Sequence, residues 1–302
     1  MKLIIDGFLS IEVTQQCNLN CEHCMKGKSR NNKITKEVVE KIFEDIIYVN
    51  TLVFTGGEIS LAYDEIKMII DIIKSKKIVV EKYQIVLNGT IYNKKMIDLL
   101  NENFKCGEIY ISTDYFHDKS ILEKYKDSVD KILFNFIKIM KEPNFEGLKY
   151  LPRKLYDCGN ATGLDNIIKV KTPSIGFISR CFNYKGMDFI KIGPQTCFDV
   201  FGNLTNGNNT YEINNDNYFG NIFEESLVDL IKKNTLKFCE DDEDYKETFI
   251  GRLNDFYGGK GISYVIKDRK LVQEDITITN NKCDDEIYDN SKRLIFQILE
   301  KR

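Results

Sequence analysis

The chain has 302 residues and a formal net charge of −3, with 43 Lys and Arg against 46 Asp and Glu. This near balance gives no electrostatic reason to expect binding to nucleic acid or to an anionic membrane. No apolar stretch approaches the ~20 residues needed to span a bilayer, and the start of the chain lacks the basic and apolar segments of a signal peptide. Nine cysteines in so long a chain do not resemble a disulfide framework, so we expect a cytoplasmic protein with reduced thiols.

The first motif is a loop that carries Cys17, Cys21 and Cys24 in the spacing C-x3-C-x2-C, directly after an expected strand over 8–14. Thiolates select iron–sulfur clusters, zinc or Cu(I). A [4Fe–4S] cluster held by three cysteines keeps its fourth iron open for another ligand. The alternative is a structural zinc site with His23 as the fourth ligand, but such sites are normally closed by paired ligands. The spacing therefore favours a cluster over zinc.

Beyond the cysteine loop, the chain alternates between helix and strand patterns. Thr35 is a candidate N-cap, and the apolar residues from Val38 to Ile47 repeat with the 3.6-residue period of a helix. Repeated β-α units with short loops imply parallel strands joined by right-handed crossovers. The expected strands cover 51–55, 83–87 and 108–113, and the expected helices cover 64–76, 93–103, 120–126 and 128–141.

These three strands each end in a short motif of glycine or polar residues. Glycine allows a ligand to approach the backbone closely, and acid, amide or hydroxyl groups can bind its polar atoms. Because the carboxyl ends of parallel strands share one edge of the sheet, we expect the motifs and the cysteine loop to face one cavity. The motifs are Gly56-Gly57-Glu58, Asn88-Gly89-Thr90 and Ser112-Thr113-Asp114.

With these four motifs in this order, the segment from about 8 to 120 resembles the radical S-adenosylmethionine (SAM) enzymes. The resemblance implies an α/β fold, a partial (β/α)6 TIM-like barrel, with a smaller C-terminal extension. It also implies one [4Fe–4S] cluster on Cys17, Cys21 and Cys24, with SAM bound to the open iron. In this family, reductive cleavage of SAM gives methionine and a 5′-deoxyadenosyl radical that abstracts hydrogen from substrate. An electron donor such as flavodoxin or ferredoxin would then be a partner.

The resemblance further assigns residues to SAM. Gly56 and Gly57 would let the backbone approach the methionyl amine, and Glu58 would accept a hydrogen bond from that ammonium group. Each assignment has a structural alternative, which is an ordinary strand-end acid, the common Asn-Gly turn or a capped loop. The other expected contacts are Asn88 with the SAM carboxylate or ribose, Ser112 and Asp114 with the ribose hydroxyls, and His23 with the adenine.

In the second half of the chain the alternating pattern weakens, and we expect a core over 1–195 followed by an extension over 196–302. An Asp-x-x-Gly-Asn turn at 199–203 and Gly-Asn-Ile at 220–222 resemble the extension of SPASM and twitch members, without the cysteine that usually follows the first glycine. Asn160 stands where these proteins usually have arginine. The elements expected here are strands at 146–151 and within 189–200, a surface loop over 203–221, a helix over 226–233, an acidic linker or helix start over 240–244, and a closing helix over 291–302.

Two residues are candidate substrate contacts, His117 after the fourth strand and Arg153 after the expected fifth. Four downstream cysteines, from 158 to 239, are widely spaced, so we expect one cluster and a lid rather than a second redox centre. The extension favours a peptide substrate, as in peptide maturation. A small metabolite such as a sugar or nucleotide derivative is the enzymatic alternative. A non-catalytic binding module stabilised by zinc or a cluster is the alternative from another class, against which the intact strand-end motifs argue.

Overall fold

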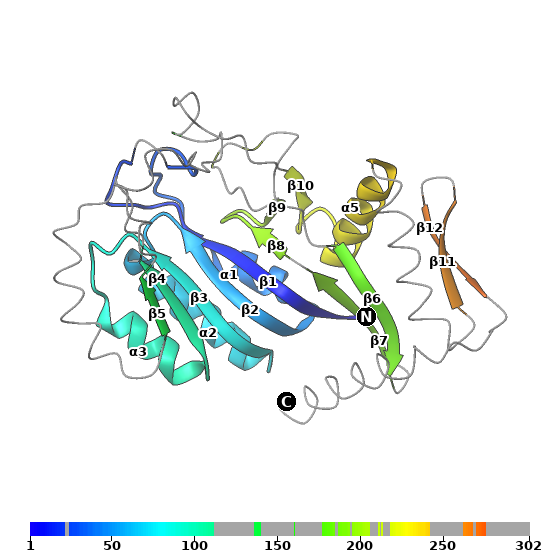
Figure 1. Cartoon of the computed structure of the whole chain (residues 1–302), viewed down its shortest axis with the longest axis horizontal. Helices are drawn as coiled ribbons and strands as arrows, with labels where there is room; N and C mark the ends of the chain where they lie inside the picture. Colours follow the sequence, from blue (N-terminus) through cyan, green and yellow to red (C-terminus); the bar gives the residue numbers. More distant parts are fainter. Residues whose placement is uncertain are drawn as a thin grey trace, which may run out of the picture.

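The computed structural model contains one large sheet with helices against one face and a C-terminal group of short strands at the opposite end from β5 (Figure 1). The main path through this 10-stranded sheet is β10-β9-β8-β1-β2-β3-β4-β5. No helix in the described part of the chain is long and apolar enough to cross a membrane. The structure describes residues 1–21, 24–111, 136–139, 160, 177–184, 187–193, 195–205, 211, 213, 218–241, 262–267 and 270–275.

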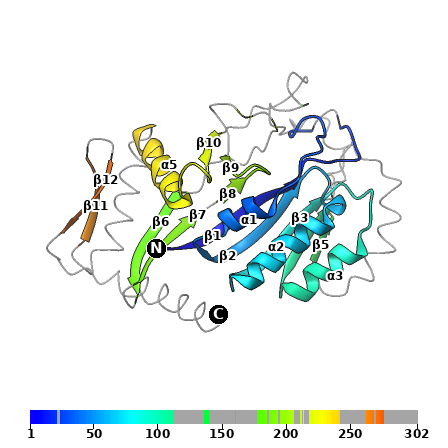
Figure 2. The ribbon, with the colours of Figure 1, turned by 180° about the vertical axis from the view of Figure 1, so that it is seen from behind.

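The first half of the chain forms the expected parallel β-α units. Each helix follows a strand and lies on the same face of the sheet (Figure 2). The strands, which pair in this order and run parallel, are β1 (Lys2–Thr14), β2 (Ile46–Gly56), β3 (Val79–Leu87), β4 (Gly107–Ile111) and β5 (Phe136–Ile139). The helices are α1 (Lys36–Ile42), the short 3-10 helix η1 (Ile59–Leu61), α2 (Tyr63–Ser75) and α3 (Lys94–Asn103).

The second half adds strands on the other side of β1. β7 pairs in parallel with the beginning of β1, and β8 pairs in parallel with its middle, so β1 lies inside the sheet. The sheet stays open between β5 and β10 in the described residues, which agrees with a partial barrel. The elements are β6 (Phe177–Tyr184), β7 (Met187–Gly193), β8 (Gln195–Phe198), β9 (Asn203–Thr205), β10 (Tyr218–Asn221), α5 (Leu227–Asp241) and a separate hairpin of β11 (Ile262–Lys267) and β12 (Lys270–Asp275).

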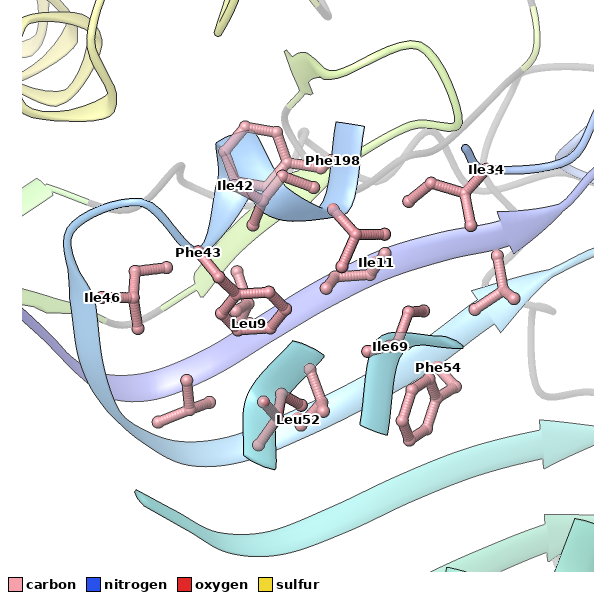
Figure 3. Close-up of a cluster of buried hydrophobic side chains, with 14 of the residues drawn as sticks. Leu9, Ile11, Ile34, Ile42, Phe43, Ile46, Leu52, Phe54, Ile69 and Phe198 are labelled. Carbon is pink, nitrogen blue, oxygen red and sulfur yellow. The ribbon is translucent and has the colours of Figure 1, made fainter. Parts of the chain in front are cut away.

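The core lies between the sheet and its helices. Leu9 and Ile11 of β1 and Leu52 of β2 point to this side and are fully buried, together with Phe43 and Ile69 from the helical layer (Figure 3). Burying each such side chain contributes about 1.5–3 kcal/mol. Because side chains alternate along a strand, the β1 residues that alternate with Leu9 and Ile11 point to the opposite face of the sheet. That face carries the polar residues of the site.

Two helix predictions are wrong in part. α1 ends at Ile42, and Ile46 and Ile47 belong to β2, where Ile46 lies opposite Leu3 of β1. The helix predicted over 128–141 contains β5, which pairs with β4. A short apolar run has no periodicity that separates a buried strand from a buried helix, so tertiary pairing decides. By contrast, α2 and α3 match their predicted ranges closely.

The C-terminal predictions also need correction. The predicted surface loop over 203–221 contains β9 and β10, and α5 continues to Asp241, so the first acidic residues after 239 end a helix. The predicted strand within 189–200 is divided between β7 and β8. The helix over 120–126, the strand over 146–151 and the closing helix over 291–302 lie outside the described residues.

Candidate active site

The cysteine loop leaves the end of β1 and is fixed by hydrogen bonds from its own main chain. The Cys17 amide donates to Ser29 Oγ at 2.9 Å, and the Cys24 amide donates to the Cys21 carbonyl at 3.2 Å. All three thiols are half-buried. His23, which lies between the last two cysteines, is outside the described residues. The loop therefore carries its three candidate ligands at the carboxyl end of β1, as predicted.

The two glycines after β2 make room for the start of this loop. The Gly57 amide donates to the Thr14 carbonyl and the Glu58 amide donates to the Gln16 carbonyl, both at 2.7 Å. A Cβ atom on Gly56 would lie 2.2 Å from the Thr14 oxygen, and one on Gly57 would lie 2.1 Å from the Gln16 oxygen. Glycine at both positions therefore leaves room for the backbone of the cysteine loop, a role that was not predicted from the sequence.

Glu58 joins the end of β2 to the turn after β3. Its side chain is fully buried, with Oε1 accepting from the Ser60 amide at 3.0 Å and Oε2 accepting from the Asn88 amide at 2.8 Å. A buried carboxylate needs such donors, because an uncompensated charge in the interior is costly. Glu58 therefore has a structural function in addition to the SAM contact that was predicted from sequence.

Asn88 connects the turn after β3 to the cysteine loop. Its Nδ2 donates to Asn18 Oδ1 at 3.0 Å and lies 3.8 Å from Cys17 Sγ, within the range of a weak N–H···S bond. Its Oδ1 accepts from the Thr90 amide at 2.9 Å, and Gly89 between them has a left-handed φ of 76° that glycine adopts without strain. The structure thus brings three predicted residues together, Cys17, Glu58 and Asn88.

Asn160 contacts the same loop from the second half of the chain. Its amide donates to the Cys24 carbonyl and its Nδ2 donates to the Cys21 carbonyl, each at 2.9 Å. The sequence singled out Asn160 only because arginine is usual at that position in the resembling proteins. In this structure Asn160 provides hydrogen-bond donors to two carbonyls of the cysteine loop.

Tyr211 is a second contact from the distant half, and sequence reasoning missed it. Its amide donates to the Lys26 carbonyl at 2.9 Å and its hydroxyl to the Gln15 carbonyl at 3.2 Å, while Arg30 Nη1 donates to the Tyr211 carbonyl at 3.0 Å. Burial raises the pKa of the Tyr211 hydroxyl, so it remains a donor at neutral pH. A single tyrosine in an Asn-rich segment carries no sequence signal that would reveal this position.

The electrostatics of the loop suit a positively charged metal group. Burial raises the pKa of the Cys17 thiol above its ordinary value, and the charges of Glu58, Cys21 and Cys24 raise it further, whereas the Leu19 amide lowers it. A bound metal reverses this effect, because it stabilises thiolates directly. Among the described residues, no group of three His, Cys, Asp or Glu is already arranged to hold a metal ion. The fit to an iron–sulfur cluster therefore rests on three soft sulfur donors in one loop and amide donors near Cys17.

The structure leaves several predicted contacts unplaced, since they lie outside the described residues. The buried thiol of Cys197 is placed: it accepts from Gln195 Nε2 at 3.0 Å, and burial raises its pKa to about 11. The unplaced candidates are His23, Ser112, Asp114, His117 and Arg153.

Residues 11–152 match the family model described as the Radical SAM superfamily. This segment is therefore a radical SAM domain. An uncharacterised protein of Methanocaldococcus jannaschii is 28% identical over 131 residues, which cover 41% of this chain and 45% of the relative. The 7-carboxy-7-deazaguanine synthase of the same organism is 29% identical over 176 residues, covering 48% of this chain and 69% of the relative. The chain thus spans less than half the length of the first of these relatives.

Among solved structures, anSMEcpe with bound AdoMet and Kp18Cys peptide has a TM-score of 0.49 at 17% identity, covering 99% of this chain and 97% of that one. BtrN in complex with AdoMet and 2-DOIA has a TM-score of 0.45 at 13% identity, covering 93% of this chain and 97% of that one. These figures describe a distant overall likeness, with a mixed α/β fold.

Proposed function

We propose that this protein cleaves SAM reductively at a [4Fe–4S] cluster held by Cys17, Cys21 and Cys24. When bound, the cluster supplies one electron, and the resulting 5′-deoxyadenosyl radical abstracts hydrogen from the substrate. The observation that carries this proposal is the connection of three strand ends at one loop: Glu58 ties β2 to the turn after β3, and Asn88 ties that turn to Cys17. A zinc-stabilised binding module would not need this connection.

The residues of the chain would act by binding and orientation. The three thiolates would hold three irons and leave the fourth accessible. Glu58 would bind the SAM ammonium in addition to its two amide donors, and Asn88 would lie near the SAM carboxylate or ribose. Ser112, Asp114 and His23 remain proposed contacts with the ribose and adenine. A flavodoxin or ferredoxin would deliver the electron.

For the substrate we propose a peptide, with His117 and Arg153 as candidate contacts. The support is the compact unit formed by β8, β9, β10 and α5 in the place of the predicted extension. The carboxylate of Asp199 accepts from the Phe201 and Asn203 amides at 2.9 Å, and Asn221 Nδ2 donates to Asn203 Oδ1 at 2.7 Å. The residues of the SPASM- and twitch-like pattern thus hold one hairpin and the following strand together.

A small nucleotide-like metabolite is the second candidate. Its support is the curated relative named as a 7-carboxy-7-deazaguanine synthase, whose matched segment covers 48% of this chain. The name of this relative refers to a small molecule, 7-carboxy-7-deazaguanine.

Anaerobic reconstitution tests the reaction. Reduced protein with SAM should form 5′-deoxyadenosine, and Cys21→Ala should lose both the cluster absorption and this product. A Cys21→Ala protein that keeps both would contradict the proposal. To separate the two substrate classes, size-fractionated cell extract is added to the enzyme either untreated or after digestion with a protease that is then removed. An increase in 5′-deoxyadenosine formation that digestion of the extract abolishes supports a peptide, and an increase that survives digestion supports a small metabolite.

A further inference from the structure

Lys26 lies two residues after Cys24 and forms a buried ion pair with β1. Its Nζ is 2.9 Å from Glu12 Oε1, and the two side chains are only 9% and 2% exposed. Lysine and glutamate are rarely buried to this extent unless they are paired. Glu12 occupies a position between the core-facing residues Ile11 and Val13, so it points to the polar face of the sheet. The pair therefore joins the far end of the cysteine loop to the strand from which the loop leaves.

The second oxygen of Glu12 extends this contact into a network. Gln15 Nε2 donates to Glu12 Oε2 at 2.9 Å, and Asn32 Nδ2 donates to Gln15 Oε1 at 2.8 Å. The network begins on β1 and reaches Asn32, which lies beyond the cysteine loop. Both ends of the loop are thus linked through one carboxylate.

The main chain of Lys26 is held from the other side. The Tyr211 amide donates to its carbonyl at 2.9 Å, and the Tyr211 hydroxyl donates to the Gln15 carbonyl at 3.2 Å. Lys26 is thereby fixed by its side chain to β1 and by its carbonyl to the C-terminal half. These two attachments together restrain the backbone at Lys26.

Stability alone is a weak explanation for such a pair. Buried ion pairs often add little over apolar residues of the same volume, because desolvation offsets the attraction. We propose that Glu12 and Lys26 are positioning residues that hold Cys24 at the distance from Cys17 and Cys21 that the cluster requires. This inference rests on the proposed function, since it assumes a cluster on these cysteines.

The test compares single and double variants that separate charge burial from positioning. Lys26→Met leaves the Glu12 carboxylate buried without its partner, so Tm should fall. Glu12→Gln with Lys26→Met removes both charges, so Tm should recover toward that of the wild type. The double variant still lacks the ion pair that ties Lys26 to Glu12. We therefore expect iron release to a chelator to become roughly 10–100-fold faster and SAM cleavage roughly 10–100-fold slower, as for other residues that orient metal ligands. Lys26→Arg, which keeps charge and reach, should behave nearly as the wild type.

Lys67→Met is the matched control, because Lys67 pairs with Asp71 at 2.6 Å on the surface, with the two side chains 50% and 57% exposed. It should change neither Tm nor iron release. A double variant that releases iron and cleaves SAM at wild-type rates would overturn the positioning role. If the double variant does not fold, Lys26→Met alone decides in the same way, because it also removes the tether between Lys26 and Glu12. Wild-type protein that binds no iron would instead overturn the proposed function.

Discussion

At the scale of single residues, Glu58 combines full burial with a position at the centre of the site. Its two oxygens each accept a backbone amide, from Ser60 and from Asn88. The family resemblance assigns this glutamate to the SAM ammonium group. The same carboxylate also fixes the turn that carries Asn88, so a substitution at this position should affect folding as well as the proposed SAM contact.

Glu58→Ala should lower both stability and SAM affinity. Each amide left without an acceptor in the interior costs about 1–3 kcal/mol, which denaturant unfolding measures directly. Loss of the ammonium partner should weaken SAM binding by about 1.5–3 kcal/mol, measured by titration of the reconstituted protein. Glu44→Ala is the control, because the Glu44 side chain is 57% exposed. A Glu58 variant that is destabilised but binds SAM as tightly as the wild type would leave it only the structural role.

Gly57→Ala should reduce cluster content as well as SAM affinity. The new Cβ would lie 2.1 Å from the Gln16 oxygen and 3.1 Å from the Cys17 nitrogen, so the loop must move. Iron analysis after reconstitution should show the loss. Gly193→Ala is a matched control, since nothing lies within 4 Å of its Cβ. Normal iron content in Gly57→Ala would show that the loop adapts to the added carbon.

At the scale of elements, local signals predicted α2, α3 and the start of α1 well and the short strands poorly. Thr35 and Asn93 cap α1 and α3 as capping residues do, by accepting from the amides of Val38 and Met96. The short strands β5, β9 and β10 depend on partners distant in the chain. Nothing within Phe136–Ile139 distinguishes a strand from a helix until β4 lies beside it.

Gly220→Ala tests the packing of β10 on α5. A Cβ at this position would lie 2.3 Å from Leu230 Cδ2, and the φ of +119° is one that other residues adopt only with strain. Such strain alone costs about 1–3 kcal/mol. We expect a lower free energy of unfolding by denaturant titration, and combination with Leu230→Ala should relieve the clash but not the strain. Gly220→Ala with unchanged stability would show that β10 is held less tightly than these contacts indicate.

At the scale of the whole molecule, the cluster count distinguishes a lid from a second redox centre. We expect about four irons per chain after anaerobic reconstitution, all on the N-terminal loop. The triple variant Cys17→Ala, Cys21→Ala, Cys24→Ala should therefore bind none. Cys197 is fully buried, and its thiol already accepts a hydrogen bond from Gln195 Nε2 at 3.0 Å. About four irons remaining in the triple variant would demonstrate an auxiliary cluster.

The sequence identifies the candidate ligands of the site but not the contacts that hold them in place. Cysteine spacing and strand-end motifs are local, so they identify Cys17, Glu58 and Asn88 directly. Asn160 and Tyr211 reach the loop only through the tertiary fold, and their own neighbours along the chain do not predict it. The same is true of Lys26, which reads as a surface lysine in sequence and is buried against Glu12.

The position of β1 inside the sheet also determines when the site can form. Residues 8–11 of β1 pair with 195–198 of β8, so one side of this strand has no partner until the ribosome has made about two-thirds of the chain. At synthesis rates of about 5–20 residues per second, the nascent chain exposes an unpaired strand edge for ~10–40 s. A cluster inserted during that interval would meet a loop still lacking its contacts with Asn160 and Tyr211. Cluster loading is therefore expected after translation, and a chaperone that shields the early edge would raise the yield of holoenzyme.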